Sequence, residues 1–270
     1  MQSLTRKSTI FGDLPSTEDL DFLMREEMRS HRIALEFERA ELGLIDRGIE
    51  STIVVFGSSR MSDKPSQPAQ NKHLRRNANT THFKPRKCYQ MAHDFGRIVS
   101  ELGGALSPKN GKHENVITTG GGPGIMEAAN RGAAEAGAPT IGLNIDLPCK
   151  QEPNKYITPG LSFHFRYFAV RKMHFAMRAN ALVVFPGGFG TLDELFEILT
   201  LKQTRKAGGM PVILFCRSYW ERLIDFNALL EFGMVEPQDL ELFKIVDSAK
   251  EGWEAILELG LAAPTPLKER

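Results

Sequence analysis

Short apolar runs and amphipathic segments alternate along most of this chain. Five apolar runs are rich in β-branched or aromatic residues and have the length of strands that are buried on both faces of a parallel sheet. These runs are residues 52–56, 116–119, 139–144, 181–185 and 211–215. Residues 161–165 alternate apolar and polar side chains as a strand does, and residues 245–246 indicate a short edge strand. The pattern therefore predicts six or seven strands.

The segments between these runs have the periodicity of helices. The segment that begins near Gly190 and ends near Gly208 places four apolar residues at i, i+3, i+4 and i+7, so that one face can pack on a sheet. These residues are Leu192, Leu195, Phe196 and Leu199. Further helices are predicted over residues 85–102, 166–179, 219–232 and 249–261. The alternation predicts an α/β fold, with a Rossmann-like, doubly wound and mostly parallel sheet of six or seven strands flanked by helices.

Two segments stand outside this alternation. A charged helix is predicted over residues 17–48, within an N-terminal helical extension of residues 1–50. The core domain then spans residues 51–270. Inside it, residues 61–86 are rich in Pro, Gln, Asn, Lys and His and have no apolar periodicity, which predicts an exposed insertion. Length alone leaves open whether this insertion is a surface loop or a lid over a site.

Composition argues against several classes of protein. Apolar residues make up 41% of the chain and charged residues 25%, which suffices for a globular core, and the net charge of +1 argues against a dedicated nucleic-acid surface. The cysteines, Cys88, Cys149 and Cys216, are three and widely spaced, so reduced thiols are expected. No apolar run approaches the roughly 18 residues of a membrane helix, and residues 1–13 lack a signal-peptide core. We therefore expect a soluble, cytoplasmic protein with neither a nucleic-acid nor a membrane partner.

Two glycine-rich turns each join a predicted buried strand to a predicted helix. They contain Gly187, Gly188, Gly190 and Thr191 in one case, and Gly120, Gly121 and Gly122 in the other. Glycine lets the backbone approach a ligand, and the unpaired N–H groups at a helix N-terminus attract anions. In a parallel sheet both turns emerge at the same edge, as does Ser58 after the first strand. These residues therefore predict a crevice that binds phosphate.

A carboxylate and an arginine accompany the first turn. Glu194 lies about one helical turn after Thr191, within reach of the sugar of a nucleotide whose 5'-phosphate is bound there. Asp193 needs no function, because an anion near a helix N-terminus is favourable by itself. Arg171 lies on the helix before the same strand. The glycine-rich stretches contain no Walker A loop and no dinucleotide fingerprint. The sequence also lacks a nucleophile elbow and a histidine pair with metal-ligand spacing. We therefore expect neither a metal nor a cofactor.

The chain resembles the LOG family of nucleotide 5'-monophosphate phosphoribohydrolases in three segments: the Arg171-Lys172 dipeptide, residues 186–194 (PGGFGTLDE) and residues 120–126 (GGGPGIM). The resemblance spans about residues 53–232. It implies a Rossmann-like enzyme, dimeric or larger, that splits the N-glycosidic bond of a nucleoside 5'-monophosphate into free base and ribose 5-phosphate. It also implies that Arg171 and Glu194 form the catalytic pair and that Lys172 contacts the substrate.

The sequence leaves the substrate open. Family members that activate cytokinins commonly show M-H-x-R-K, whereas Phe168, Ala169 and Val170 precede Arg171 in this chain. AMP, CMP or related monophosphates are therefore expected as readily as a cytokinin riboside monophosphate. A nucleotide sensor or carrier without turnover is the alternative to an enzyme. Lysine decarboxylation, a label that relatives have carried, is rejected because no lysine lies in the S-x-H-K pattern of a pyridoxal phosphate site.

Overall fold

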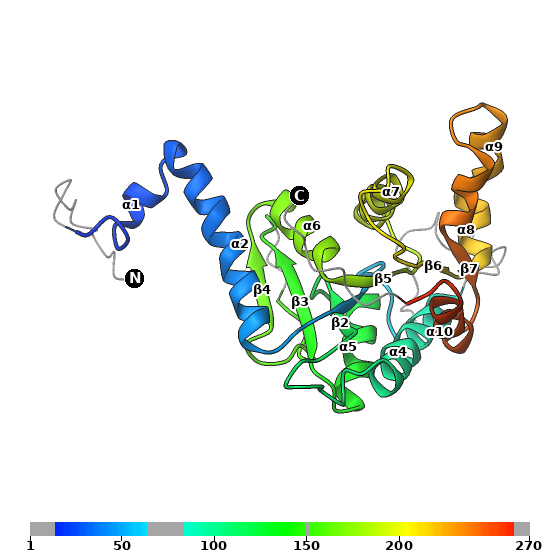
Figure 1. Cartoon of the computed structure of the whole chain (residues 1–270), viewed down its shortest axis with the longest axis horizontal. Helices are drawn as coiled ribbons and strands as arrows, with labels where there is room; N and C mark the ends of the chain where they lie inside the picture. Colours follow the sequence, from blue (N-terminus) through cyan, green and yellow to red (C-terminus); the bar gives the residue numbers. More distant parts are fainter. Residues whose placement is uncertain (1–13, 64–83, 149–151, 262–270) are drawn as a thin grey trace, which may run out of the picture.

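The computed structural model describes residues 14–63, 84–148 and 152–261. Seven strands within these residues form one sheet in the order β4-β3-β2-β1-β5-β6-β7, and every neighbouring pair is parallel (Figure 1). They are β1 (Thr52–Phe56), β2 (Val116–Thr119), β3 (Thr140–Ile145), β4 (Ser162–Phe165), β5 (Ala179–Val184), β6 (Val212–Phe215) and β7 (Lys244–Val246). The predicted α/β fold is confirmed, and the sheet is parallel throughout.

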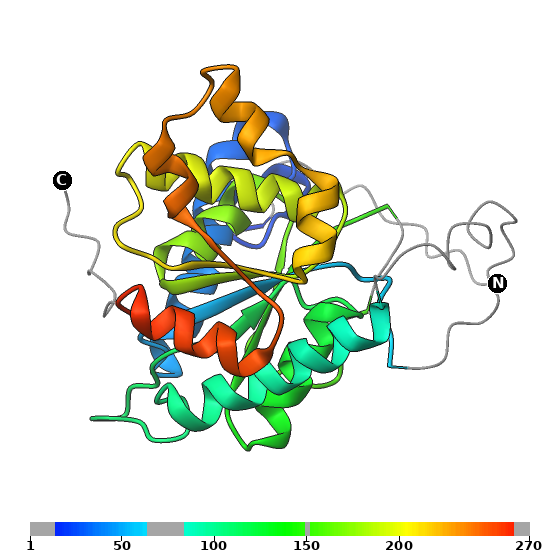
Figure 2. The same cartoon turned by 90° about the vertical axis from the view of Figure 1, so that its right-hand side faces the viewer.

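Helices cover both faces of the sheet (Figures 1 and 2). One layer consists of α4 (Pro85–Leu102), α5 (Ile125–Glu135) and α10 (Ala249–Glu258). The other contains α2 (Arg29–Asp46), α6 (Phe168–Met177), α7 (Phe189–Gln203) and α8 (Arg217–Leu223). A buried apolar cluster lies on each side of the sheet, with Phe95 of α4 in one and Trp220 of α8 in the other. The central strands β1 and β5 contribute to both clusters, which explains their continuous apolar sequence.

Strands β1 and β5 mark the point where the chain reverses its direction across the sheet. From β1 the chain passes through α4 to β2 on one side, whereas α6 brings it from β4 to β5 on the other side of β1. The helices that follow β1 and β5 cover opposite faces of the sheet. A crevice therefore opens at the carboxyl ends of these strands, which is where open α/β sheets bind ligands.

The N-terminal helix is interrupted, so the prediction of one helix over residues 17–48 is wrong. Instead the chain forms α1 (Leu20–Leu23), the 3-10 turn η1 (Glu26–Met28) and α2. Arg25 has an extended backbone between α1 and η1. The guanidinium of Arg32 donates to the carbonyl groups of Leu23 (2.6 Å) and Arg25 (2.5 Å). This side chain thus satisfies carbonyl groups at the break that a continuous helix would have paired with its own N–H groups.

Two other helices differ from their predicted limits. Residues 219–232 form two helices, α8 and α9 (Phe226–Glu231), because the side chain of Asp225 accepts hydrogen bonds from the first N–H groups of a new helix. Helix α7 ends at Gln203 rather than near Gly208, and Arg205 beyond it has a left-handed φ of 59° that ends helical geometry.

The apolar face of α7 is also rotated relative to the prediction. Leu195 is buried as expected, but Phe196 is 39% exposed and Ile198 is buried in its place. The helix therefore turns Leu195 and Ile198 toward the sheet and leaves the ring of Phe196 on the outer side.

Some predictions concern residues that the structure does not describe. Most of the insertion predicted at 61–86 lies in residues 64–83, outside the described part of the chain, and the division into residues 1–50 and 51–270 stays a prediction. None of the described helices is long and apolar enough to cross a membrane. Cys88 and Cys216 are buried free thiols with their Sγ atoms 2.7 Å apart, and Cys149 is not described.

Candidate active site

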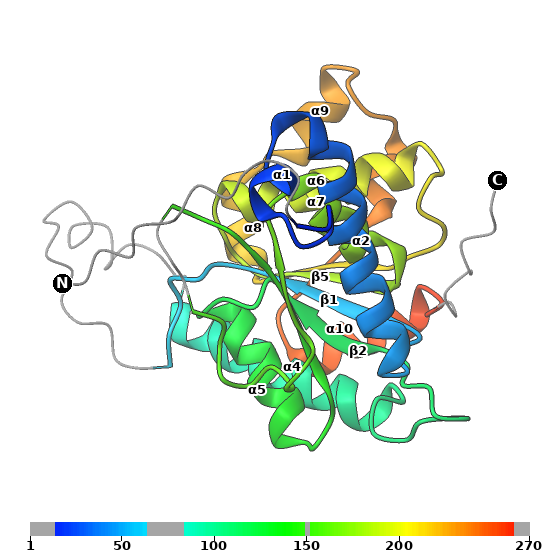
Figure 3. The same cartoon turned by 90° about the vertical axis from the view of Figure 1, so that its left-hand side faces the viewer.

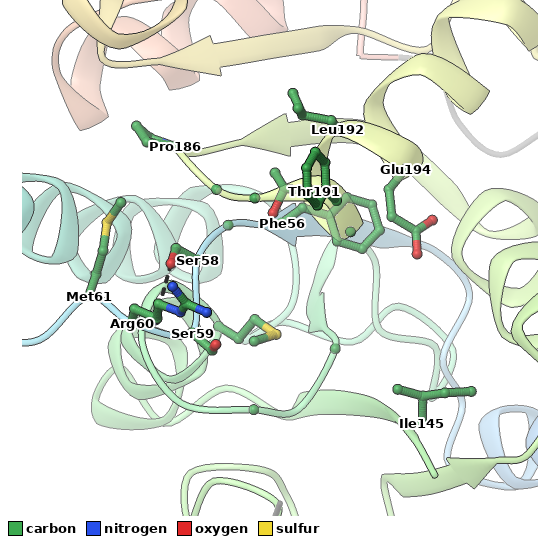
Figure 4. A pocket seen from close by; sticks show the side chains of 18 of the residues that line it. Phe56, Ser58, Ser59, Arg60, Met61, Ile145, Pro186, Thr191, Leu192 and Glu194 are labelled. Carbon is green, nitrogen blue, oxygen red and sulfur yellow. Dashed lines mark hydrogen bonds between the residues drawn. The ribbon is translucent and has the colours of Figure 1, made fainter. Parts of the chain in front are cut away.

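A cavity of about 830 Å³ lies at the carboxyl ends of the central strands. Its walls come from the turns after β1, β2 and β5, from the start of α6 and α7, and from α8. In Figure 4, Thr191 and Glu194 of α7 border the cavity on one side, and Ser58, Ser59 and Arg60 after β1 border it on another. The crevice predicted at this edge of the sheet therefore exists.

The turn between β5 and α7 brings its glycines to the cavity. Gly187, Gly188, Gly190 and Thr191 all line it, and Gly188 is the N-cap of α7, with no side chain that caps the first N–H groups. A Cβ atom on Gly187 would lie 2.1 Å from the Thr191 hydroxyl oxygen, so only glycine fits there. The hydroxyl of Tyr219 donates to the Gly187 carbonyl at 2.5 Å. The turn thus presents a helix N-terminus to the cavity, an arrangement that favours an anion.

The turn between β2 and α5 is more enclosed. Gly120 and Gly122 line the cavity, but Gly121 does not. Gly121 has a φ of 74°, and a Cβ atom there would lie 2.2 Å from Oδ1 of Asn144. The side-chain amide of Asn154 donates to the carbonyl groups of Gly121 (3.2 Å) and Gly122 (3.1 Å). Protein groups therefore hold this turn in place.

Ser58 connects all three turns. It lines the cavity, its N–H donates to the carbonyl of Pro186 at 3.0 Å, and its carbonyl accepts the N–H of Ile125, the first residue of α5, at 3.1 Å. Its hydroxyl accepts the N–H of Arg60 at 3.1 Å. Because these bonds occupy both backbone groups of Ser58, its backbone fixes the spacing between the glycine turns.

Arg171 and Glu194 meet in the cavity wall, although 22 residues separate them in the sequence. Nη2 of Arg171 donates to Oε1 of Glu194 at 3.3 Å, and their side chains are 12% and 6% exposed. Helix α6 supplies the arginine and α7 the glutamate, on either side of β5 in the chain. The structure therefore brings together the two residues that the resemblance implied as a pair.

Burial raises the pKa of Glu194 to about 7, and the positive charges of Arg171 and Lys172 oppose this shift. A carboxyl group with such a pKa exists in both protonation states near neutral pH, which suits proton transfer. Burial also lowers the pKa of Arg171. Among the described residues, Nε of Arg171 is buried without a hydrogen-bond partner. An unsatisfied buried donor costs free energy, so the placement of this guanidinium is destabilising by itself.

Lys172 does not line the cavity. Its ammonium group pairs with Asp193 (2.8 Å) and Glu197 (3.1 Å), and thereby links α6 to the outer side of α7. Asp193, which the sequence explained by helix electrostatics alone, thus has a partner. The contact between Lys172 and a substrate stays a prediction, whereas its pairing places a positive charge that lowers the pKa of Glu194.

Comparisons with known proteins agree with these motifs. A family model described as "Possible lysine decarboxylase" matches residues 126–256. The probable cytokinin riboside 5'-monophosphate phosphoribohydrolase LOG4 from Oryza sativa subsp. japonica is 24% identical over 208 residues, which cover 76% of each chain. The phosphoribohydrolase of the same description from Mycobacterium tuberculosis is 27% identical over 159 residues, which cover 58% of this chain and 83% of that protein. The chain is thus similar to proteins of the LOG family.

Solved structures with a similar fold include a molybdenum cofactor carrier protein from Chlamydomonas reinhardtii. It is 20% identical, with a TM-score of 0.49, and the match covers 78% of this chain and 98% of that one. Among the described residues of this chain, no group of three or more His, Cys, Asp or Glu side chains is arranged to hold a metal ion.

Several residues that line the cavity were not predicted as site residues from the sequence. They are Arg60, Met126, Asn144, Leu147, Phe168 and Tyr219. Tyr219 follows β6, and only the position of β6 beside β5 brings it to the glycine turn. Arg60 was available as a signal, because it directly follows Ser58 and Ser59 at the end of the first predicted strand.

Proposed function

We propose that this protein hydrolyses the N-glycosidic bond of nucleoside 5'-monophosphates and releases the free base and ribose 5-phosphate. The observation that carries the proposal is the buried Arg171–Glu194 pair at 3.3 Å in the wall of the cavity, in which Glu194 lies one helical turn beyond the glycine-rich N-terminus of α7. The similarity to phosphoribohydrolases from rice and Mycobacterium tuberculosis supports the same reaction.

The turn of Gly187, Gly188, Gly190 and Thr191 is proposed to bind the 5'-phosphate. Their position at the N-terminus of α7 places backbone N–H groups and the positive end of the helix dipole near the cavity. Gly120, Gly122 and Ser58 complete the wall beside this turn. A phosphate fixed here would hold the ribose within reach of Glu194, because the carboxylate lies only one turn further along the same helix.

Glu194 is proposed to act on the anomeric carbon of the ribose. As the C–N bond breaks, its electron pair leaves with the base and positive charge develops on the ribose, which a carboxylate stabilises. The oxygen of a water molecule then adds to the carbon, one of its protons passes to Glu194 and from there to solvent, and the departing base takes up one proton from solvent, so that one water is consumed per bond broken. Arg171 keeps Glu194 in place at 3.3 Å.

AMP, CMP and cytokinin riboside monophosphates are the proposed substrates, with a place in cytokinin biosynthesis for the last of these. Relatives described as cytokinin riboside 5'-monophosphate phosphoribohydrolases support the last of these substrates. The ring of Phe168, 50% exposed at the start of α6, lines the cavity and lies 5.1 Å from the Arg171 guanidinium. A flat aromatic surface of this kind suits stacking with a base.

Base release from a panel of nucleotides tests the proposal. AMP, CMP and isopentenyladenosine monophosphate are incubated with the protein, and free base and ribose 5-phosphate are measured by chromatography. We expect equal amounts of both products from at least one nucleotide. The matching nucleosides should react with kcat/KM lower by about ten- to hundredfold, since charge-assisted hydrogen bonds to the phosphate are lost. Binding of nucleotides without any base release would instead support the sensor or carrier.

A homodimer or larger homo-oligomer in the cytoplasm is proposed as the state in which the protein works. Four large apolar side chains are exposed on α6 and α7: Phe168 (50%), Met173 (51%), Phe189 (92%) and Phe196 (39%). Exposed apolar groups of this size on two adjacent helices are typical of a protein interface. The buried free thiols of Cys88 and Cys216 suit a reducing compartment. Sedimentation equilibrium of the wild type should give a dimer mass or more, and a monomer at micromolar concentration would contradict the proposal.

A further inference from the structure

Helix α2 of the N-terminal extension lies against α6, the helix that carries Arg171 (Figure 3). The two helices are joined at three levels. Near the start of α6, the Glu36 carboxylate accepts hydrogen bonds from backbone N–H groups of residues 166 and 167. In the middle, Nε2 of His174 bonds to the carbonyl of Phe37 at 3.1 Å. At the end, Arg178 pairs with Glu41 at 2.5 Å.

The contact of Glu36 has a specific place in the architecture of α6. Tyr167 is the N-cap residue of this helix, and it forms no side-chain cap of its own. Oε2 and Oε1 of Glu36 accept the N–H groups of Arg166 at 2.8 Å and Tyr167 at 3.0 Å. A carboxylate from another helix therefore fixes the turn that precedes α6, and its negative charge lies near the positive end of the helix dipole.

A continuous series of hydrogen bonds leads from this carboxylate to Glu194. The Glu36 carboxylate accepts a hydrogen bond from the N–H of Tyr167, and the carbonyl of Tyr167 accepts one from the N–H of Arg171 at 3.2 Å. The guanidinium of Arg171 then donates to Glu194 at 3.3 Å. Phe168, the next cavity residue on α6, directly follows the fixed peptide group. A shift of this turn would therefore move both Arg171 and Phe168.

The packing of α2 on the sheet fits a rigid support. A Cβ atom on Gly43 would lie 2.6 Å from the ring of Phe163 in β4, so only glycine lets α2 lie so close to the strand that leads into α6. The ring of His174 lies between those of Phe37 and Phe165, with centroid distances of 4.8 and 5.5 Å. Burial lowers the pKa of His174, which keeps the imidazole neutral in this contact. Strand β4 and helix α6 therefore share one support from α2.

We propose that Glu36 is a positioning residue for the reaction, and that α2 thereby forms part of the catalytic apparatus rather than a detached extension. The inference rests on the proposed function, because it assigns Glu36 to the geometry of Arg171. Pre-organised geometry matters for rate, since displacement of a catalytic group by about 1 Å can cost about a hundredfold. Glu36 itself touches the backbone of the β4–α6 turn and is not among the residues that line the cavity.

The test compares Glu36→Ala, Glu36→Gln and Glu38→Ala. Glu38 is an exposed residue on the same helix, so its variant controls for the loss of a charge from α2. We expect Glu36→Ala to lower kcat for base release by about tenfold because Arg171 is displaced, with a smaller increase in KM because Phe168 shifts while the phosphate turn is untouched. Glu36→Gln keeps one acceptor oxygen and should recover part of the rate. Glu38→Ala should match the wild type.

Hydrogen exchange of the amides at residues 168–171 gives a second readout that does not depend on activity. Glu36→Ala should accelerate exchange there by about tenfold relative to Glu38→Ala, with unchanged exchange in α7. Wild-type protein that releases no base would overturn the proposed function alone. The exchange rates at residues 168–171 would still show whether Glu36 fixes the start of α6. An active wild type with an unchanged kcat in Glu36→Ala, or equal losses in Glu36→Ala and Glu38→Ala, would overturn the positioning inference.

Discussion

The two glycine-rich turns look alike in sequence, but apart from Gly187, which packs against Thr191, the glycines of the two turns have different surroundings. After β5, a Cβ atom added to Gly188 or Gly190 would meet nothing within 4 Å beyond its own local backbone, so the missing side chains leave open space beside the cavity. After β2, a Cβ on Gly121 would collide with Asn144, and one on Gly124 would lie 2.3 Å from the carbonyl oxygen of Ser58. Gly188 and Gly190 leave open space in the first turn, which fits the proposed approach of a ligand, whereas Gly121 and Gly124 allow close packing of protein in the second.

This difference separates a turn that is proposed to bind the phosphate from a turn that supports the fold. The first turn has Glu194 one helical turn away and is held at Gly187 by a single hydroxyl, that of Tyr219. The second is held by the Asn154 side chain, and the N–H of Ile125 at the start of its helix is already bonded to Ser58. We therefore expect substitutions in the first region to change binding and turnover, and substitutions in the second to change stability.

The largest effect is expected for Glu194→Gln. The amide keeps the size of the side chain but removes its charge and its ability to take a proton, so kcat should fall by about a thousandfold. Nucleotide binding should be retained, because the phosphate turn is intact. Product formation tests the expected loss of turnover, and equilibrium binding of AMP to the same preparation tests whether nucleotide affinity is retained. Wild-type turnover in this variant would remove Glu194 from the mechanism.

Gly121→Ala should produce the largest loss of stability. The substitution forces an alanine into a backbone with φ of 74° and against Asn144, whose amide is fixed by bonds to Ser162 and to the carbonyl of Phe163. Strain and overpacking together should lower the free energy of unfolding by about 3 kcal/mol. Urea unfolding measures this change. A fully stable variant with lost nucleotide binding would show that the second turn binds ligand as the first does.

Gly190→Ala is the matched test of the first turn. Gly190 is the second residue of α7 and has open space around it, so alanine should raise the stability of the protein slightly, by about 0.5 kcal/mol. The same methyl group would occupy space next to the proposed phosphate position, and the Kd for AMP should increase by about tenfold. Calorimetric titration and thermal unfolding separate the two effects. Unchanged affinity would place the phosphate elsewhere in the cavity.

The smallest expected effect is the dependence of the reaction rate on pH, which tests Glu194 beside the first turn. With a pKa of about 7, Glu194 is increasingly protonated as pH falls, so kcat/KM should drop about fivefold between pH 7 and pH 6. Lys172→Ala removes a charge that lowers this pKa and should move the profile to higher pH. For stability the sign is opposite: the folded state holds its proton more tightly than the unfolded chain, so this group favours folding at low pH and loses that contribution as pH rises toward 7. A flat rate profile would contradict Glu194 as the base.

The local sequence pattern was sufficient to predict most of the strands and both glycine-rich turns. Apolar runs of strand length predicted the strands, because burial on both faces of a sheet demands such composition, and glycine between strand and helix predicted the turns. Arg171 and Glu194 were selected as candidates because they lie in motifs that resemble a known family, and the structure places the two side chains beside each other. The breaks in the N-terminal helix and between α8 and α9 were not predicted, because side chains stabilise them: Arg32 bonds to carbonyl groups at the first break, and Asp225 caps the helix after the second.

By itself, the sequence determined the strands, the helix N-termini at the glycine turns and the chemical groups near them. Only the tertiary structure decided which of those groups meet. The order of strands puts β6 beside β5 and so brings Tyr219 to Gly187, while the packing of α2 on α6 brings Glu36 to the turn before Arg171. The physical reason is that hydrophobic periodicity is local, whereas these contacts join residues 32 and 131 positions apart in the chain.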